Sequence, residues 1–458
     1  MVKPMEWGEL PSVVLLEIYD YLSVKDRLIA STVCKNWRAP VFQVPLSDDE
    51  LVLKLCSESD IPKVKFLARN FAVKVQAVSL IFDASSPNCL DLVEEILELL
   101  EDNTQLKSLR IRFSEESLAK NVFGQHANTN ELILRSYFVK KVLEPLRDVL
   151  VARNCLETFS FPFIQELGRK GSVILSSLSK TNKAYSIQNL FLATVRNAFA
   201  FGSIGPTLFS AWNVNSFKSL QMLSLDHDVL SDDVLATLGV DNRLGGLKRL
   251  SLTAISANPD VSNAGWTKFI ANNPSCGVRL TVAGRQVMIN HSSNLLFPNI
   301  PLTHFRTMHC KGIRISCMNS LIRWNEKSLE HLELIDENYD WMEYMSQTEE
   351  VDGEQFLDPL IYAAWRCPNL RTIKIGFVYC GHNLIGIARL KGSNLSCLEI
   401  AKSQVVYHNL NQLSQEVSKA LGRKWRPTDD PANKLKQTNS KIPKTIFQTM
   451  RALCEDEA

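Results

Sequence analysis

Leu220-Gln221-Met222-Leu223-Ser224-Leu225 and Leu247-Lys248-Arg249-Leu250-Ser251-Leu252 carry the same pattern of leucines. Apolar residues that alternate with polar ones over so short a stretch are typical of a strand with one buried face. The pattern Leu-x-x-Leu-x-Leu, or a close variant, recurs along most of the chain and predicts a series of similar strands. Further clear copies begin at Leu106, Leu329, Leu370 and Leu395, weaker ones begin at Val75, Leu156, Ile187 and Leu302, and residues 278–282 are another candidate.

The segments between these strands have the apolar spacing of helices. A strand followed by a helix, repeated along the chain, is the unit of a leucine-rich repeat. Because side chains alternate along a strand, the leucines should point into a shared core and the polar residues toward the concave side of a parallel sheet. The sequence therefore predicts an α/β solenoid. The helical patterns cover residues 90–101, 132–152, 232–238, 266–272, 313–325, 356–366 and 410–421.

The spacing of the repeats is irregular. Several strands follow one another within the ~20–29 residues typical of such repeats, but the intervals from Leu106 to Leu156 and from Leu329 to Leu370 are longer. The turns lack a regular asparagine or cysteine. We therefore predict degenerate repeats. A non-repeating α/β domain with a parallel sheet is the alternative, and ten similar strand signatures argue against it.

A different module precedes the array. Pro11 suits the first turn of a helix, and Val14, Leu15, Ile18 and Leu22 then recur at helical spacing,. Ser23 can cap a second helix, after which an apolar stripe continues to Trp37,. Three helices this short hold too little core to be stable alone, so their apolar stripe predicts a partner surface. The stretch reads Leu10-Pro11-Ser12-Val13-Val14-Leu15-Leu16-Glu17-Ile18-Tyr19-Asp20-Tyr21-Leu22-Ser23-Val24-Lys25-Asp26-Arg27-Leu28-Ile29-Ala30-Ser31-Thr32-Val33-Cys34-Lys35-Asn36-Trp37-Arg38.

This stretch resembles the F-box. The resemblance lies in the Leu-Pro opening, the paired leucines, the aromatic-x-aromatic-Leu end of the first helix, the Ser-x-x-Asp, and above all the Val-Cys-Lys-Asn-Trp-Arg ending. Two positions depart from the family pattern: Val13 replaces a residue that is often acidic, and Arg27 replaces one that is often apolar. Neither change removes the apolar face.

The resemblance implies binding to the Skp adaptor, which links F-box proteins to a cullin scaffold and its RING subunit. An ordinary helical hairpin packed on the next domain is the alternative, but periodicity alone does not explain the positions of the Pro, Cys and Trp. The docking residues carried over by position are Leu10, Pro11, Val14, Leu15, Ile18, Leu22, Val33, Cys34 and Trp37.

The whole architecture resembles the F-box/leucine-rich-repeat proteins and the F-box-only proteins with weak repeats. We predict an F-box over residues 5–50, a degenerate leucine-rich-repeat solenoid over 51–421 and a basic tail over 422–458. The resemblance implies a non-catalytic substrate-recognition subunit of a Skp-cullin-F-box (SCF) ubiquitin ligase. A scaffold that binds the adaptor without a role in degradation is the competing hypothesis.

The sequence shows no motif for catalysis or cofactor binding. It has no phosphate-binding Gly-x-x-x-x-Gly-Lys-Ser/Thr loop and no Gly-x-Ser-x-Gly nucleophile elbow,. His309, Cys310 and Cys317 are the best candidates for a metal site, but the chain has no Cys-x-x-Cys pair, so we expect no metal and no cofactor,. An enzyme built on an α/β domain would instead require a deep pocket with convergent titratable groups.

Two polar segments are candidates for substrate contact. The long interval after Leu329 mixes acidic residues with Tyr339, Trp341 and Tyr344, and long loops on a rigid scaffold often carry recognition,. A solvated loop whose aromatics fold back on the solenoid is the alternative. The last forty or so residues are basic and could contact an acidic partner,. The alternative is that this tail is disordered and solvated and has no specific role.

Composition places the chain among intracellular proteins. The 51 basic and 49 acidic residues nearly balance, which gives no general argument for nucleic-acid binding,. The 11 cysteines are odd in number and scattered through apolar segments, as in a reducing compartment,. No signal peptide and no apolar run of the ~18 residues needed for a membrane span is visible. We therefore expect a cytoplasmic or nuclear protein with protein partners.

Overall fold

The computed structural model divides into two compact units, Met1–Phe161 with Val173–Ile187, and Pro162–Ser172 with Gln188–Ala458. Tyr339, Trp341, Tyr344 and His309 lie outside the described residues, as does the tail beyond residue 429. The structure describes residues 7–22, 24–41, 46–114, 117, 129–152, 155–162, 164, 169–179, 182–193, 215–238, 246–254, 261–283, 288–289, 295–308, 310, 312–335 and 358–429.

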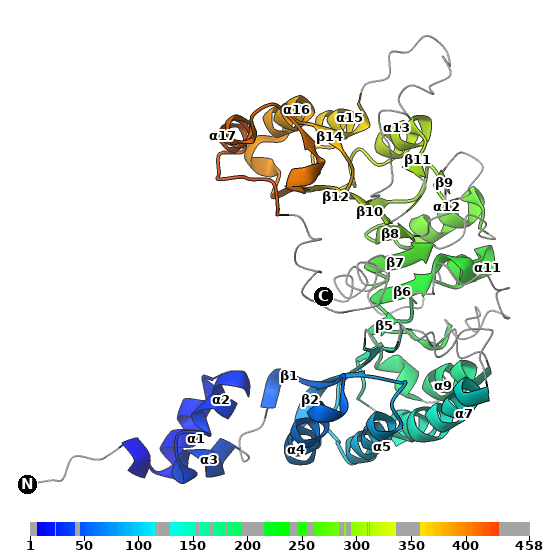
Figure 1. The fold of residues 1–458 in the computed structure, drawn as a ribbon. Helices are drawn as coiled ribbons and strands as arrows, with labels where there is room; N and C mark the ends of the chain where they lie inside the picture. The colour runs from blue at the N-terminus through cyan, green and yellow to red at the C-terminus, as the bar shows by residue number, and fades with distance from the viewer. Residues whose placement is uncertain are drawn as a thin grey trace, which may run out of the picture. The chain divides into compact units, whose positions relative to one another are not determined.

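Three short helices form the N-terminal module of the first unit, as the sequence predicts. They are α1 (Ser12–Asp20), α2 (Val24–Ala30) and α3 (Lys35–Val41), preceded by a single 3₁₀ turn, η1 (Trp7–Glu9). Pro11 stands immediately before α1, where its missing N–H leaves no hydrogen bond unmade,. Helices α1 and α3 pack against each other, and Figure 1 shows the three helices in dark blue.

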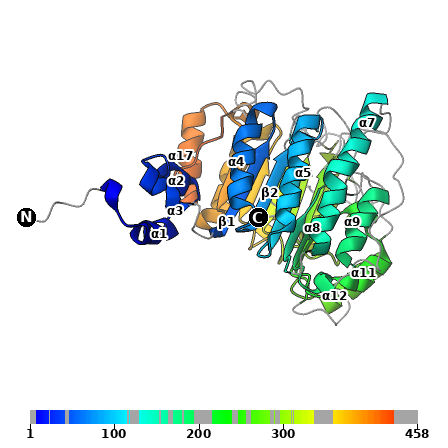
Figure 2. The same cartoon turned by 90° about the horizontal axis from the view of Figure 1, so that it is seen from below.

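Four parallel strands follow in the first unit, and each lies beside its neighbours in sequence order. They are β1 (Leu46–Leu55), β2 (Val75–Phe82), β3 (Ser108–Phe113) and β4 (Thr158–Ser160). The register aligns Leu53 with Leu80 and Leu80 with Ile111, so their buried side chains form one row of the core. Helices cover the side of the strands on which this buried row lies (Figure 2). Among them are α4 (Ile61–Phe71), α5 (Pro87–Glu101), α7 (Thr129–Phe138) and α8 (Glu144–Ala152).

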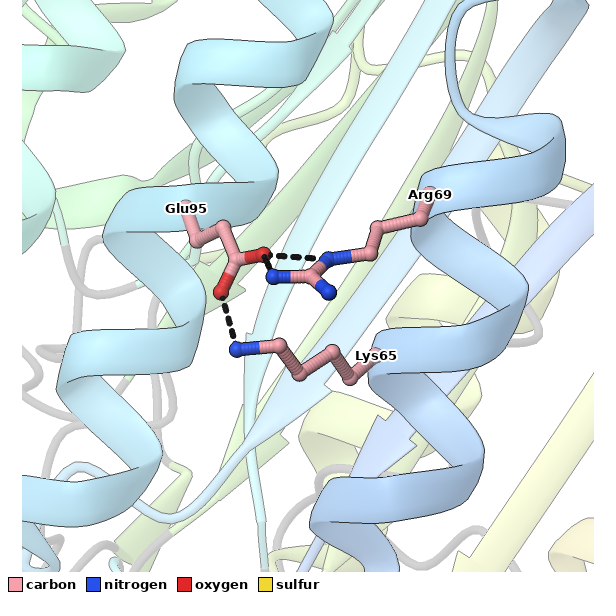
Figure 3. Close-up of polar contacts among 3 residues, drawn as sticks. All are labelled: Lys65, Arg69 and Glu95. Carbon is pink, nitrogen blue, oxygen red and sulfur yellow. Dashed lines mark hydrogen bonds and ion pairs between the residues drawn. The ribbon is translucent and has the colours of Figure 1, made fainter.

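Ion pairs join the outer surfaces of α4 and α5. The carboxylate of Glu95 accepts from Lys65 Nζ at 2.8 Å and pairs with Arg69 Nη2 at 2.6 Å, as Figure 3 shows. The hydrogen bond from Lys65, reinforced by Arg69, lowers the pKa of the Glu95 carboxyl. Because all three side chains are partly exposed, these ion pairs orient the helices more than they stabilise the fold,.

The second unit contains eight described strands of the same kind. They are parallel and follow sequence order, which confirms the predicted α/β class with a parallel sheet. The strands are β5 (Asn189–Phe191), β6 (Met222–Asp226), β7 (Arg249–Ala254), β8 (Gly277–Ala283), β10 (Leu302–Met308), β12 (His331–Ile335), β13 (Thr372–Ile375) and β15 (Cys397–Ile400). Two short parallel pairs lie outside this series: β9 (Met288–Ile289) with β11 (Gly312–Ile313), and β14 (Tyr379–Cys380) with β16 (Val405–Val406).

Helices of the second unit pack on one side of these strands (Figure 1). They are α11 (Asp232–Leu238), α12 (Asn263–Asn272), α13 (Ile315–Trp324), α15 (Pro359–Arg366), α16 (Gly381–Lys391) and α17 (Leu410–Leu421). Among the described residues, no helix is long and apolar enough to cross a membrane.

An apolar row runs through the core of the second unit. Its members occupy aligned positions on successive strands and are all buried, and full burial of each such side chain contributes about 1.5–3 kcal/mol. This continuous row, rather than the interior of any one repeat, holds the array together. The row consists of Leu225, Leu252, Leu280, Phe305, Leu332, Ile373 and Leu398.

Buried asparagines close three of the turns that lead from a helix into the next strand. Asn103, Asn273 and Asn325 follow α5, α12 and α13 and are buried. Asn325 donates through Nδ2 to the carbonyl of Leu321 at 3.0 Å and accepts from the N–H of Leu302 at 2.9 Å. Each amide therefore satisfies main-chain groups that a helix end leaves without partners. These asparagines do not stand out in the sequence, because their distance from the preceding strand varies.

Replacing Asn325 by alanine should destabilise the second unit by about 1–3 kcal/mol, because the N–H of Leu302 would be left buried without an acceptor,. Urea unfolding of the two proteins measures the difference. The control is Asn411→Ala, which removes an exposed amide and should change stability by less than about 0.5 kcal/mol,. Equal midpoints for the two variants would show that the buried amide contributes nothing.

Candidate functional site

The N-terminal module has a small core of its own. Leu15 and Tyr19 are fully buried on one face of α1. The Tyr19 hydroxyl donates to the carbonyl of Trp37, and the two rings meet edge to face with centroids 6.2 Å apart. Burial raises the pKa of the Tyr19 hydroxyl, so it remains a hydrogen-bond donor at neutral pH,. These contacts join α1 to α3.

Three further hydrogen bonds tie the end of the module to its beginning. The indole Nε1 of Trp37 donates to the carbonyl of Trp7 at 2.8 Å. The amide of Asn36 donates to the carbonyls of Leu10 and Gly8, at 2.8 and 3.1 Å. Trp37 and Asn36 therefore hold the segment before α1 in place, which gives the Asn-Trp pair of the sequence motif a structural role.

Arg27 explains one of the two departures from the family pattern. Its side chain is buried although the residue is charged. The guanidinium Nε donates to the carbonyl of Leu22 at 2.8 Å. That carbonyl lies in the turn between α1 and α2. Arg27 therefore ties α2 to this turn, and its aliphatic stem can fill apolar space,.

The outer surface of the module is unusually apolar for so small a unit. Val13 is 75% exposed, Tyr21 85% and Val33 66%. Ile29 and Trp7 are also exposed. Isolated exposed apolar residues are ordinary, but several of them within about thirty residues are typical of a surface for binding a partner. We call these five residues together with Pro11 and Val14 the apolar surface of the module.

The predicted docking residues divide into three groups. Pro11, Val14 and Val33 are exposed and lie on the apolar surface. Leu15 is fully buried, and its contacts are internal. The exposed residues Val13 and Tyr21, at the two ends of α1, and Ile29 of α2 are not among the predicted docking residues. The half-buried docking residues are Leu10, Ile18, Leu22, Cys34 and Trp37.

A polar cluster lies on the side of the second unit's strands that carries no described helix, where Ser251, Glu333 and Thr372 are buried and His304 and His331 are half-buried. We call this side the helix-free face. The residues on it alternate with the buried row of the core, so they point away from the helices. Aligned positions on successive strands are Ser224, Ser251, Arg279, His304, His331, Thr372 and Cys397, with Arg306, Glu333, Lys374 and Glu399 in the row beside them.

Glu333 links two cations on this face. Its carboxylate accepts from Arg306 Nε at 2.8 Å and pairs with Lys374 Nζ at 3.2 Å. Burial alone would raise the pKa of the Glu333 carboxyl, but Arg306 and then Lys374 outweigh burial and lower it. The three side chains therefore form a charged bridge across β10, β12 and β13.

Two histidines stack beside this bridge. The rings of His304 and His331 are nearly parallel, 11° apart, with centroids separated by 3.9 Å. Burial, followed by the charges of Arg279 and other neighbours, lowers the pKa of His304 to about 2. Burial also lowers the pKa of His331, although Glu333 opposes the shift. Both rings are therefore neutral at pH 7, which allows two imidazoles to lie in contact without charge repulsion.

The described residues hold no group of three or more His, Cys, Asp or Glu side chains arranged for a metal. Cys310 and Cys317, two of the metal candidates, are buried, and burial raises the pKa of the Cys317 thiol to about 11. Burial likewise raises the pKa of Cys276 to about 12 and of Cys367 to about 11. These thiols are protonated at neutral pH and serve as core residues.

Comparison with known proteins supports the resemblance seen in the sequence. Residues 7–39 match the F-box domain. The chain is 24% identical to human (Homo sapiens) F-box only protein 33, in an alignment that covers 92% of this chain and 83% of that protein. It is 23% identical to F-box/LRR-repeat protein 21 of Ovis aries, over 92% of this chain and 90% of that protein. The N-terminal helices are therefore an F-box domain, and the chain as a whole is similar to F-box proteins with leucine-rich repeats.

Proposed function

We propose that this protein is a non-catalytic substrate-recognition subunit of an SCF ubiquitin ligase. The apolar surface of the F-box, whose exposed residues include Val13 and Val33, is the observation that carries the proposal. F-box proteins generally act by binding the Skp adaptor, which brings them to a cullin-RING scaffold. Residues 5–50 would supply the adaptor-binding module, and residues 51–421 the repeats that bind a protein substrate.

Such a subunit acts through proximity. A rigid array holds the substrate close to a charged ubiquitin-conjugating enzyme, which turns an encounter between two molecules into a reaction within one complex. No reactive side chain of the receptor is needed for this step, in agreement with the raised pKa values of the buried thiols Cys276, Cys317 and Cys367. The repeats supply the rigidity, because each strand is hydrogen-bonded to its neighbours within its unit.

Adaptor docking is the first part of the proposal to test. The double variant Val13→Asp/Val33→Asp places two charges on the apolar surface without touching the buried Leu15 or Tyr19. It should bind purified Skp adaptor at least tenfold more weakly than the wild type, because burying an unpaired carboxylate is costly. A pull-down with purified proteins measures the loss. The matched control is Val73→Asp, a partly exposed valine outside the F-box, which should bind as the wild type does.

The role in ubiquitination requires a second experiment. A scaffold that binds the adaptor would pass the pull-down and yet direct no transfer of ubiquitin. Proteins captured by the adaptor-bound chain would be added to two reconstituted ligase reactions, one that contains the chain and one that lacks it. Ubiquitination that depends on the wild-type chain and is lost with Val13→Asp/Val33→Asp supports the receptor. Adaptor binding with no dependent ubiquitination supports the scaffold. Tyr339, Trp341 and Tyr344 remain proposed substrate contacts, which alanine variants in the same assay would test.

A further inference from the structure

Four helices of the second unit end along one edge of its strands. Helices α13, α15, α16 and α17 pack side by side (Figure 1). The strands that follow the first three are parallel, and Thr428, after α17, forms a parallel bridge with Ala401. The carboxyl ends of all four helices therefore meet at the edge where the strands begin. We call residues 323–330, 365–371, 389–395 and 416–424 the helix-end edge.

Exposed cations gather on the helix-end edge. It carries eight exposed lysines and arginines but only three glutamates, which are half-buried, whereas the whole chain balances 51 basic against 49 acidic residues. The helix dipole favours cations near a carboxyl end and accounts for part of this excess. The edge therefore has a net positive charge that is open to solvent. The cations are Arg323, Lys327, Arg366, Arg371, Arg389, Lys419, Arg423 and Lys424, and the glutamates are Glu326, Glu330 and Glu416.

Large apolar side chains are exposed among these cations. Trp365 on α15 is 61% exposed and Leu390 on α16 is 47% exposed. Trp365 lies one turn beyond the half-buried Ile361, and Leu390 lies one turn beyond Gly386,. We call these four residues the apolar strip. A helix dipole explains the cations but not the exposed tryptophan and leucine, which are typical of a surface for binding a partner.

Gly386 leaves open space on the strip. A Cβ atom at this position would meet only Ile361 Cδ1, at 3.8 Å, which is an ordinary contact. A glycine inside a helix is less favourable than alanine, and neither crowding nor a positive φ requires one in the middle of α16,. Packing within the chain therefore does not account for Gly386, whereas the open space suits a side chain of a partner.

An open cavity adjoins the strip between α16 and α17. Its volume is about 460 Å³, and it is lined by Arg389, Glu416, Lys419 and Ala420. Arg389 directly precedes Leu390 of the strip and pairs with Glu416 at 3.2 Å. Two cations and one carboxylate leave the cavity positively charged, so it can accept an acidic side chain beside an apolar one.

We propose that the helix-end edge binds an acidic amphipathic helix of a partner protein. The net positive charge selects an acidic partner by charge complementarity. The apolar strip lies on helices, whose main-chain groups are bonded internally, so it offers no strand edge to an extended segment. A helix satisfies its own main chain and presents apolar side chains at the one-turn spacing of Ile361 and Trp365. The proposal does not depend on the ligase function, because this surface lies outside the F-box.

The test uses the full chain and a fluorescein-labelled helical peptide. Leucines recur on one face of the peptide, and glutamates and alanines fill its other positions. A second peptide has glutamine in place of every glutamate. Fluorescence anisotropy should show that the glutamate peptide binds roughly tenfold more tightly than the glutamine peptide, with an affinity that falls as salt rises.

Two variants place the peptide on the strip. Trp365→Ala/Leu390→Ala should weaken binding roughly tenfold, because it removes the exposed apolar anchors,. The matched control Val378→Ala/Val406→Ala truncates two exposed valines elsewhere in the second unit and should bind as the wild type does. Gly386→Glu fills the open space with a repelling charge and should also weaken binding. Its melting temperature should not fall, because glutamate forms helices better than glycine,.

Three results would overturn the proposal. Equal affinity for the two peptides would reject an acidic partner. Unchanged binding in both Trp365→Ala/Leu390→Ala and Gly386→Glu would reject this surface. A single-stranded oligonucleotide that binds more tightly and displaces the peptide would reject a polypeptide ligand. Sedimentation of the chain over a range of concentrations tests a further occupant, since self-association that Trp365→Ala/Leu390→Ala abolishes would assign the surface to a second copy instead.

Discussion

Replacing Leu15 by alanine should unfold the F-box locally while the strands of both units stay folded. Leu15 is fully buried, and truncation of a buried leucine to alanine costs about 2–5 kcal/mol,. A module of three short helices has little stability to lose, because its core consists of a few side chains such as Leu15 and Tyr19,. The loss should therefore exceed the stability of the module itself.

Hydrogen exchange measures this effect segment by segment. In the variant, amides of α1 and α3 should lose protection, while those of β7 and β8 should retain it,. The control is Val33→Ala, which truncates a side chain that is 66% exposed and should change protection little,. Full protection of α1 in Leu15→Ala would contradict the described core. The two variants should also differ in how they affect docking. Leu15→Ala should weaken adaptor binding because the F-box unfolds, whereas Val33→Ala should weaken adaptor binding while the F-box stays folded.

Acid should destabilise the second unit through His227. This residue is fully buried, and neither ring nitrogen has a hydrogen-bond partner among the described residues. Burial lowers the pKa of its imidazole from 6.5 to about 4. Between these values the unfolded chain binds a proton that the folded chain excludes, so stability falls as pH falls from 6.5 to 4. The loss amounts to about 3 kcal/mol, and it is absent above pH 6.5 where both states are neutral,.

Urea unfolding at pH 7 and at successively lower pH values measures the slope. His304 and His331 also have lowered pKa values and add to the loss in the same direction. In the variant His227→Leu, the free energy of unfolding should therefore still fall with pH, but by less than in the wild type, because the contribution of His227 is removed. At pH 7 it should be at least as stable as the wild type, since the buried ring makes no hydrogen bond with the described residues that leucine would lose,. An unchanged slope would show that His227 is hydrated or protonated in the folded protein.

The fold was predictable because its signal is repeated. The leucines at 220, 223 and 225 share their pattern with those at 247, 250 and 252, and the structure pairs Leu223 with Leu250 and Leu225 with Leu252 on the neighbouring parallel strands β6 and β7. The F-box was predictable for another reason: the spacing between its Leu-Pro opening and its Trp-Arg end is specific. Periodicity thus identified the repeats, and motif spacing identified the F-box.

The exposure of individual side chains was not predictable from pattern. Leu15 and Val14 belong to the same apolar face in the sequence, yet Leu15 is buried and Val14 exposed. Only the packing of α1 on α3 decides which of them is covered. The turn asparagines Asn103, Asn273 and Asn325 escaped notice for a related reason, because their hydrogen-bond partners lie up to 35 residues away in sequence,.

The cations of the helix-free face show the same limit. Arg249, Arg279 and Arg306 are far apart in the sequence, and each is a plain polar residue in its own strand. The strand register brings them onto one face, and the register depends on the pairing of whole repeats,. A surface that several repeats build together can be read from a structure more directly than from a single sequence.

Calorimetric titration of the purified full chain with purified Skp adaptor measures whether the apolar surface of the F-box binds the adaptor. We expect one adaptor bound per chain, with a negative change in heat capacity because exposed side chains such as Val13, Tyr21 and Ile29 become buried,. The Val13→Asp/Val33→Asp variant should show little or no heat of binding. A folded wild-type chain that binds no adaptor, or a variant that binds as tightly as the wild type, would contradict the assignment of this surface.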